Sequence, residues 1–324
     1  ESTRGYRSRA AADMISSRAL ALVALIFCFA ALSVVAQSDD MPAPFYRVLY
    51  VTSPMMSGDD VTILQNLIAR SPYVTSVPTD GQYDNATATA VSQFQEGNAI
   101  AGVELGVFDS ATANLLLELH SCDGYIDDGT PAGELGYLYK LRIQVFRNRS
   151  YETKGQLYDA DNNLRYEFRV RAHGHDVADV SPSWPSFTST EGLNMFTSDG
   201  NTPTGLAECD LNSPEGDALQ YGPFPITRVV KGLKGNAEFL LPSMDALRTG
   251  ILLHTGIWYE YGWRPEENMP NSSGCLHSHP QQIKDIWQIL ADDLGVQVRE
   301  NPGGSQPYPY TPQGLISIEQ VGCQ

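Results

Sequence analysis

The spacing of apolar residues changes along the chain, and this change limits the folds that the chain can adopt. Between residues 58 and 120 apolar residues such as Leu64, Leu67 and Ile68 recur at the three- and four-residue spacing of a helix with one buried face. Farther along, short alternating runs are broken by Gly and Pro, which indicates β-strands. A length of 324 residues allows about two domains. We therefore predict an α+β protein with a helical domain at 45–120, a mainly β domain at 134–300 and a C-terminal tail at 301–324.

The helical region contains one pattern twice. A glycine, one or two apolar or aromatic residues and a short gap precede a threonine that begins a helix. Gly81 leads in this way to Thr87, and Gly106 leads to Thr112. Glycine allows turn conformations that a side chain hinders, so each glycine is expected to mark a turn before its helix.

The second region predicts a sandwich or barrel with one late helix. Residues 138–146 alternate as a half-buried strand, and residues 157–170 have the pattern of two strands joined by an Asp- and Asn-rich turn. Further short strands are expected near 224–226 and 239–241. Only 282–294 has clear helical periodicity.

The N-terminus has the features of a secretory leader. Arg7, Arg9 and Arg18 precede an apolar run at 19–35, and small residues ending at Ala36 supply a cleavage site. We predict a leader at 1–36, with Met14 as the start of translation, and a secreted, extracellular or periplasmic mature protein. The alternative is an uncleaved membrane anchor, since the run approaches the length that spans a bilayer. No other membrane association is expected.

Charge and cysteine content narrow the partners and the redox state. The chain has 21 Lys and Arg against 38 Asp and Glu, a formal net charge of -17, so it repels phosphate backbones and no nucleic-acid partner is expected. Beyond the leader stand Cys122, Cys209, Cys275 and Cys323. The sequence around Cys275 favours a free thiol. Two of the other three cysteines are expected to pair, and their spacing does not say which.

A cysteine and a histidine late in the chain suggest nucleophilic chemistry. Residues 251–253 form an apolar strand that ends at His254, and Cys275 follows Gly274 in a predicted turn. A thiol is nucleophilic as the thiolate and needs a neighbouring base or cation. Backbone N–H groups around Gly274 and Cys275 are candidates for an oxyanion hole.

Two histidine-containing segments are candidate metal sites. His254, Cys275, His277 and His279 contain zinc-binding groups, but their alternating spacing is unusual for zinc. The segment 173–176, His-Gly-His-Asp, lacks a third ligand at a suitable spacing and is interpreted as a polar loop. We predict no metal and no cofactor.

The helical region resembles the three-helix peptidoglycan-binding domain. The resemblance implies the fold, and it implies a groove between helices that holds glycan or stem peptide; a spacer without affinity is the alternative. The matching residues are Gly58, Asp60, Val61, Leu64, Gln65, Asp80, Gly81, Tyr83, Thr87, Ala90, Val91, Phe94, Gln95 and Thr112.

The second region resembles the L,D-transpeptidase (YkuD-type) catalytic domain. Three ordered motifs match: Thr-Pro-Thr-Gly at 202–205, His-Thr-Gly at 254–256 and Ser-Ser-Gly-Cys-Leu at 272–276. The resemblance implies that Cys275 is the nucleophile and His254 its base. It also implies that a carbonyl near Thr255 or Gly256 orients the imidazole. The expected remaining site residues are Gly274 and Ser273 for catalysis and His277, Ser272, Trp258 and Tyr259 for substrate binding.

Two positions depart from the family pattern. His277 stands where the family has Arg or Asn, and Ser273 stands where members often have His. Three sequons, at Asn85, Asn148 and Asn271, would carry glycans if the source organism glycosylates.

Two functions are therefore weighed. The first is cysteine-dependent acyl transfer on peptidoglycan stem peptides through a thioester, with an amine or water as acceptor. The second is a non-catalytic extracellular structural or adhesion glycoprotein built on the same two folds. Either would have peptidoglycan or another extracellular glycan or peptide polymer as its partner, and the sequence leaves the oligomeric state open.

Overall fold

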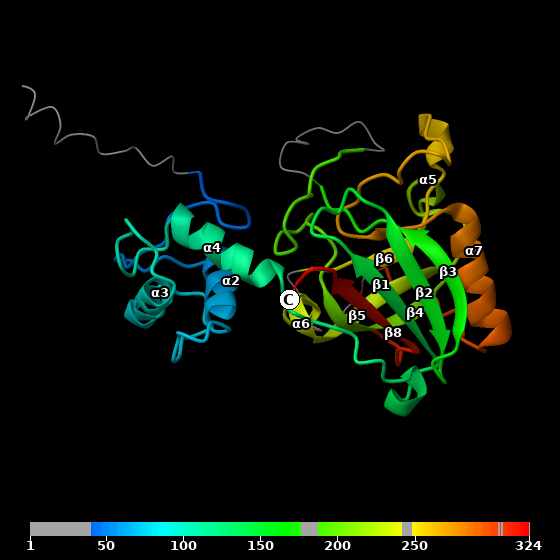
Figure 1. Cartoon of the computed structure of the whole chain (residues 1–324), viewed down its shortest axis with the longest axis horizontal. Coiled ribbons are helices and arrows are strands. Elements are labelled where there is room, and N and C mark those ends of the chain that lie inside the picture. The colour runs from blue at the N-terminus through cyan, green and yellow to red at the C-terminus, as the bar shows by residue number, and fades with distance from the viewer. Residues whose placement is uncertain (1–39, 176–186, 242–247, 304, 306, 324) are drawn as a thin grey trace, which may run out of the picture. The chain divides into compact units, whose positions relative to one another are not determined.

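Three helices form the first domain: α2 (Asp59–Ile68), α3 (Asn85–Gly97) and α4 (Ser110–Ser121). The computed structural model describes residues 40–175, 187–241, 248–303, 305 and 307–323 (Figure 1). An aspartate caps each of the last two helices, because Asp84 accepts from the backbone N–H of Thr87 and Asp109 from that of Thr112, both at 2.8 Å. The repeated threonines thus lie in the first helical turn, three residues after their caps.

Two buried glutamines make the same contacts in the two copies of the repeat. Gln65 Nε2 donates to Thr87 Oγ1 at 3.0 Å, and its Oε1 accepts from the N–H of Gly81 at 2.8 Å. Gln95 Nε2 donates to Thr112 Oγ1, and its Oε1 accepts from the N–H of Gly106, both at 3.0 Å. Gln65 of α2 therefore holds the loop that leads into α3, and Gln95 of α3 holds the loop that leads into α4.

The β domain is built on one eight-stranded mixed sheet, so the predicted α+β class is confirmed. The strand order is β3-β2-β1-β8-β4-β5-β6-β7. Most neighbours are antiparallel, and the pairs β1–β8 and β6–β7 are parallel. The strands are β1 (Tyr139–Val145), β2 (Thr153–Asp159), β3 (Leu164–Val170), β4 (Gly205–Asn212), β5 (Ile226–Lys234), β6 (Leu252–His254), β7 (Leu276–His277) and β8 (Gly314–Gln320).

The two edges of the sheet meet beside the predicted site. Arg171, directly after β3, exchanges two backbone hydrogen bonds of 2.9 and 2.8 Å with His277 in β7. This bridge joins the first and last strands of the order, so the sheet curves into a near-barrel. Of the two architectures predicted, the barrel is the closer.

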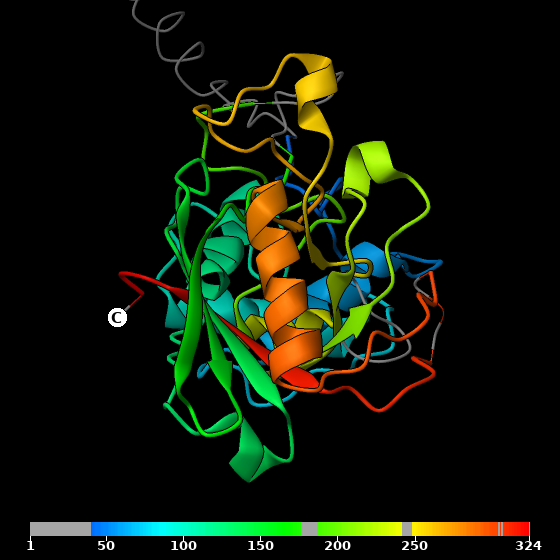
Figure 2. The same cartoon turned by 90° about the vertical axis from the view of Figure 1, so that its right-hand side faces the viewer.

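Short helices complete the β domain. They are η1 (Ala132–Leu135), α5 (Ala218–Tyr221), α6 (Gly235–Leu240), η2 (Trp258–Tyr261), α7 (Pro280–Gln288) and the π-helical turn η3 (Ile289–Asp293). The predicted late helix corresponds to α7 and η3. Helix α7 lies along the sheet (Figure 2), where Tyr166 of β3 donates to Asp285 at 2.8 Å.

Two sequence expectations about elements are wrong. Residues 239–241 do not form a strand but end helix α6, whose first residue, Gly235, has φ of +69°. The predicted tail at 301–324 is not a tail, because it contains β8, which lies between β1 and β4. The β domain therefore extends through residue 320.

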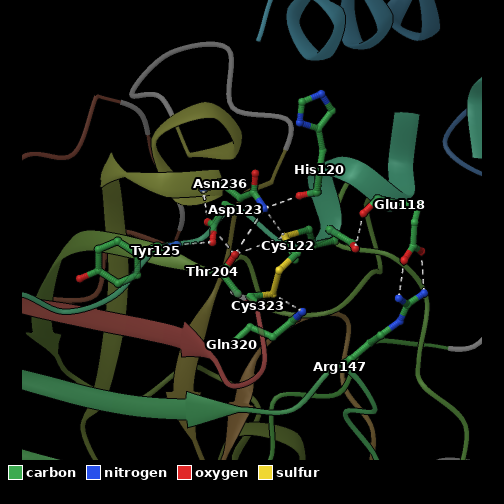
Figure 3. The surroundings of a disulfide bond; sticks show 12 residues. Glu118, His120, Cys122, Asp123, Tyr125, Arg147, Thr204, Asn236, Gln320 and Cys323 are labelled. Carbon is green, nitrogen blue, oxygen red and sulfur yellow. Dashed lines mark hydrogen bonds and ion pairs between the residues drawn. A yellow bond between two sulfur atoms is a disulfide. The ribbon is translucent and has the colours of Figure 1, made fainter. Parts of the chain in front are cut away.

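A disulfide joins the ends of the two domains. Cys122, directly after α4, pairs with Cys323, three residues after β8. Around it, Gln320 Nε2 donates to Cys323 Sγ at 2.9 Å, and Asn236 Nδ2 donates to the carbonyl of His120 at 2.8 Å (Figure 3). The structure thus selects one of the pairings that the sequence left open and leaves Cys209 as a buried free thiol.

The predicted leader at 1–36 lies outside the described residues. Among the helices that are described, none has the length and apolar character needed to cross a membrane.

Candidate active site

Strand register brings the predicted nucleophile and base to one face of the sheet. β6 and β7 run parallel, and His254 is the partner of His277. Because side chains alternate along a strand, Leu252 and His254 share a face with Cys275 and His277. Leu252 and Cys275 pack together on this face. The gap of twenty-one positions between the histidine and the cysteine therefore closes through the pairing of two short strands.

Tyr221 of α5 contacts His254 and the apolar cluster that contains Cys275. Its ring lies 5.0 Å from that of His254, and it packs against the cluster of Ile226, Leu252 and Cys275. Sequence reasoning missed this residue because α5 has only four residues and no amphipathic period to reveal its orientation.

A backbone carbonyl fixes the tautomer of His254. Nδ1 lies 2.6 Å from the carbonyl oxygen of Thr255. A carbonyl only accepts, so Nδ1 carries the proton and Nε2 is the basic nitrogen. The residue that follows the histidine thus supplies an orienting group of the kind that the motif resemblance implies.

Thiol and imidazole are both neutral at physiological pH in this conformation. Burial raises the pKa of the Cys275 thiol to about 11 and lowers that of the His254 imidazole to about 4. The Cys275 thiol donates to the carbonyl of Gly250 at 3.3 Å. Formation of a thiolate therefore requires transfer of the thiol proton to the imidazole together with stabilisation of the new charge.

Hydrogen bonds to neighbouring groups hold the turn before the nucleophile. The Ser272 hydroxyl donates to the Cys275 carbonyl at 2.8 Å and accepts from the Gly274 N–H at 3.0 Å. Thr202 of the Thr-Pro-Thr-Gly motif donates to the Gly274 carbonyl at 2.8 Å. The first and third motifs therefore form one structural unit. The Gly274 N–H is engaged within this turn, which leaves the Cys275 amide as the candidate oxyanion donor.

A buried arginine that sequence reasoning missed also contacts this turn. Arg248 donates to the Ser273 carbonyl at 3.1 Å and to the Gly200 carbonyl at 2.7 Å. A Cβ on Gly274, which has φ of +99°, would lie 1.9 Å from its guanidinium. No spacing signal identifies Arg248, because it precedes the strand of His254 in an irregular segment.

A second arginine stands beside the thiol. Arg228 of β5 is the register partner of Leu252, so it lies on the face that carries Cys275. Its guanidinium pairs with Glu215 at 2.5 Å and donates to Asn301 at 2.9 Å. The polar surroundings of the thiol thus include one cation that is already matched by a carboxylate.

Three residues expected to bind substrate are buried and contact other parts of the site. His277 lies behind His254, with ring centroids 4.7 Å apart and its Nδ1 2.8 Å from the Pro270 carbonyl. Trp258 packs against Trp263 and His277. Ser272 holds the turn described above. Their role in substrate binding stays a prediction.

The other expected site residues differ in exposure. Tyr259 is 64% exposed and Ser273 is also exposed. Gly256 is buried against Trp258, whose Nε1 would lie 2.1 Å from an added Cβ. The described part of the His-Gly-His-Asp segment contacts the nucleophile turn through its backbone, because the His173 carbonyl accepts from the Ser272 N–H at 2.8 Å; Asp176 lies outside the described residues. Among the described residues no three His, Cys, Asp or Glu side chains are placed to hold a metal ion.

The three sequons differ in accessibility. Asn85 is exposed at the start of α3, and Asn148 is partly exposed. Asn271 is buried, and its Nδ2 donates to Thr188 Oγ1 at 3.1 Å. A glycan on Asn271 would require this part of the folded protein to open.

Comparison with known proteins supports the identity of the first domain. Residues 57–116 match a family model described as a putative peptidoglycan binding domain, which confirms the resemblance predicted for the helical region. No curated protein matches the chain.

Two solved structures are similar to the chain. An L,D-transpeptidase (residues 123–326) from Xylanimonas cellulosilytica DSM 15894 is 16% identical, covers 86% of this chain and 100% of its own, and has a TM-score of 0.26. An L,D-transpeptidase (Yku) from Stackebrandtia nassauensis is 12% identical, covers 82% and 94%, and has a TM-score of 0.27.

Proposed function

We propose that this chain is an extracellular acyltransferase of the L,D-transpeptidase type that acts on peptidoglycan stem peptides through Cys275. One observation carries the proposal: the β6–β7 register sets a free cysteine and a histidine of defined tautomer on the same face of the sheet. The three ordered motifs support the reaction class.

The proposed reaction has two balanced steps. His254 Nε2 accepts the Cys275 proton, and the sulfur attacks the carbonyl carbon of the amide between the third and fourth stem residues. The C–N bond breaks, the departing D-alanine nitrogen takes the proton from the imidazolium, and a thioester remains. An amine of a second stem then attacks the thioester and releases the thiol, giving a cross-link. Water in place of that amine gives carboxypeptidase activity.

The helical domain is proposed to hold the polymer. Its match to a peptidoglycan binding family supports this role. In this arrangement the helical domain would raise the local concentration of stem peptides near the β domain, to which the Cys122–Cys323 disulfide ties it covalently.

Secretion is proposed on two grounds. The N-terminal pattern of basic, apolar and small residues is typical of a leader. The Cys122–Cys323 disulfide fits an oxidising compartment, since disulfides are rare in the cytosol.

One observation favours the second candidate function, a non-catalytic structural glycoprotein. Cys275 and His254 are both buried, and burial raises the thiol pKa to about 11. A thiol that never ionises or meets substrate would have only a packing role.

Covalent labelling separates the two functions. We expect a carbapenem to form an adduct on the full chain, detected as a mass increase on the peptide that contains Cys275. The Cys275→Ala variant should form none, and the Cys209→Ala variant should label like the wild type, because the Cys209 thiol is fully buried in the core beside the Tyr139 hydroxyl. Folded wild-type protein that forms no adduct would support the structural role.

A further inference from the structure

Arg248 is a buried cation with only neutral acceptors around it. It is 1% exposed, and its guanidinium donates to the carbonyls of Met195, Gly200, Asn201 and Ser273 at 2.7–3.1 Å. Within the described part of the chain no carboxylate forms an ion pair with it. A buried charge without a counterion is costly, which points to a use for that charge.

The segment from Arg248 to Gly250 contacts the nucleophile turn at two points. Arg248 binds the Ser273 carbonyl, two residues before the nucleophile, and the Gly250 carbonyl accepts from the Cys275 thiol at 3.3 Å. The guanidinium also fills the space that a side chain at Gly274 would need. The guanidinium therefore lies against Ser273 and Gly274, the two residues directly before Cys275.

We infer that Arg248 is a positioning residue whose fixed charge stabilises the Cys275 thiolate and its turn during the proposed acyl transfer. The Gly250 carbonyl favours the protonated thiol, whereas Arg248 favours the charged form that must follow. The inference rests on the proposed function, but its test needs no acyl substrate.

Other charged or titratable groups near the thiol also affect its ionisation. The charge of Arg228 favours the Cys275 thiolate. Glu215 forms an ion pair with Arg228, and its negative charge disfavours the thiolate. Tyr221 and His254 complete the set on the neighbouring elements α5 and β6. Asp199 is the carboxylate that interacts with Arg248 at longer range. Burial lowers the pKa of Arg248 to about 10, so it stays charged at neutral pH. Arg248 is therefore the cation near the thiol that has no carboxylate partner among the described residues.

The test is the pH dependence of Cys275 alkylation by iodoacetamide, read by mass spectrometry on the full chain. Arg248→Lys keeps the charge, Arg248→Gln keeps hydrogen-bond donors without charge, and Arg248→Met removes both. We expect the thiol pKa to rise by about one unit in the Gln and Met variants, slowing alkylation roughly tenfold at a given pH below it, and to change little in the Lys variant.

Two controls make the result decisive. Arg149→Met removes another buried arginine that donates to a carbonyl, that of Thr202, and interacts with Asp123 rather than with Cys275. It should leave the thiol pKa unchanged. Cys209, buried in the core, reports unfolding because only an opened chain exposes it.

Equal thiol pKa values in the Lys and Gln variants would overturn the inference in favour of a purely structural role. Loss of the fold in both neutral variants would overturn it in the same way. If the thiol pKa follows the charge but no acyl-enzyme ever forms, the inference stands and the proposed function fails.

Discussion

Gly274 is the residue at which the demands of the turn and of the buried arginine coincide. Its φ of +99° is a conformation that L side chains rarely adopt, and Arg248 occupies the place of a Cβ. We expect Gly274→Ala to lower the free energy of unfolding by about 3 kcal/mol, from backbone strain and overpacking together. Urea denaturation followed by fluorescence measures this loss.

The control for Gly274 is a glycine with the same backbone strain and open space. Gly262 has φ of +88° and no atom within 4 Å of an added Cβ. Gly262→Ala should cost only about 1–2 kcal/mol. Equal losses at the two positions would show that the contact with Arg248 does not matter.

The buried imidazole of His254 makes stability depend on pH. Its pKa is about 4 in the folded protein and about 6.5 when unfolded. Below pH 6.5 the unfolded chain binds a proton that the folded chain does not bind, so stability falls as pH drops toward 4. His277 has its pKa lowered in the same direction and adds to this trend.

Replacing His254 should weaken that pH dependence. We expect His254→Gln to lose about 2 kcal/mol less than the wild type between pH 6.5 and pH 5, in urea titrations at the two pH values. The same loss in both proteins would mean that His254 becomes protonated in the folded state as readily as in the unfolded chain.

Among the elements, the helices of the first domain depend on buried glutamines as well as on apolar packing. Gln95 satisfies the N–H of Gly106 and the carbonyl of Val107, at 3.0 and 2.7 Å. Gln95→Leu leaves both of these partly buried groups without this partner and should destabilise the protein by about 2–3 kcal/mol. Gln93 lies two positions earlier on the same helix. Gln93→Leu removes only exposed contacts to Thr75 and should cost less than about 0.5 kcal/mol. Thermal or urea unfolding that ranks the two variants equally would contradict this account.

Local patterns predicted the elements whose neighbours in sequence are also their neighbours in space. The helices of the repeat and the β2–β3 hairpin follow from periodicity and turn residues. β8 did not, because it pairs in parallel with β1, which lies more than 170 positions earlier, and follows a Pro- and Tyr-rich stretch typical of a tail. Residues 239–241 are apolar enough for a strand, but the positive φ of Gly235 turns the chain into α6.

The same distinction between local pattern and tertiary fold separates the residues of the site that the sequence predicts from those that it does not. Motifs located Cys275 and His254, since those residue types in that order are specific. Arg248 and Tyr221 have no such signal, because only the tertiary fold brings them to the thiol. The stacking of Trp258 on His277, and of His277 on His254, likewise depends on the tertiary fold and has no signal in the sequence.

In the molecule as a whole, the disulfide joins two cysteines that lie 201 positions apart in the sequence, Cys122 after the helical domain and Cys323 at the end of the β domain. Cross-linking so long a loop restricts the unfolded chain, so Cys323→Ser should lower the free energy of unfolding by about 2–4 kcal/mol. Reductant should destabilise the wild type by the same amount and leave the Cys323→Ser variant unchanged. Destabilisation of the variant by reductant would show that another bond is responsible.

The central claim is that the Cys275 sulfur forms a thioester with a stem peptide while His254 moves the proton. The most direct measurement is mass spectrometry of full-length protein that is quenched in acid after mixing with muropeptides carrying a tetrapeptide stem. We expect one released D-alanine per acylated protein and a matching mass increase on the peptide that contains Cys275, absent in Cys275→Ala and much reduced in His254→Gln. A folded wild-type protein whose Cys275 stays unmodified under these conditions would contradict it.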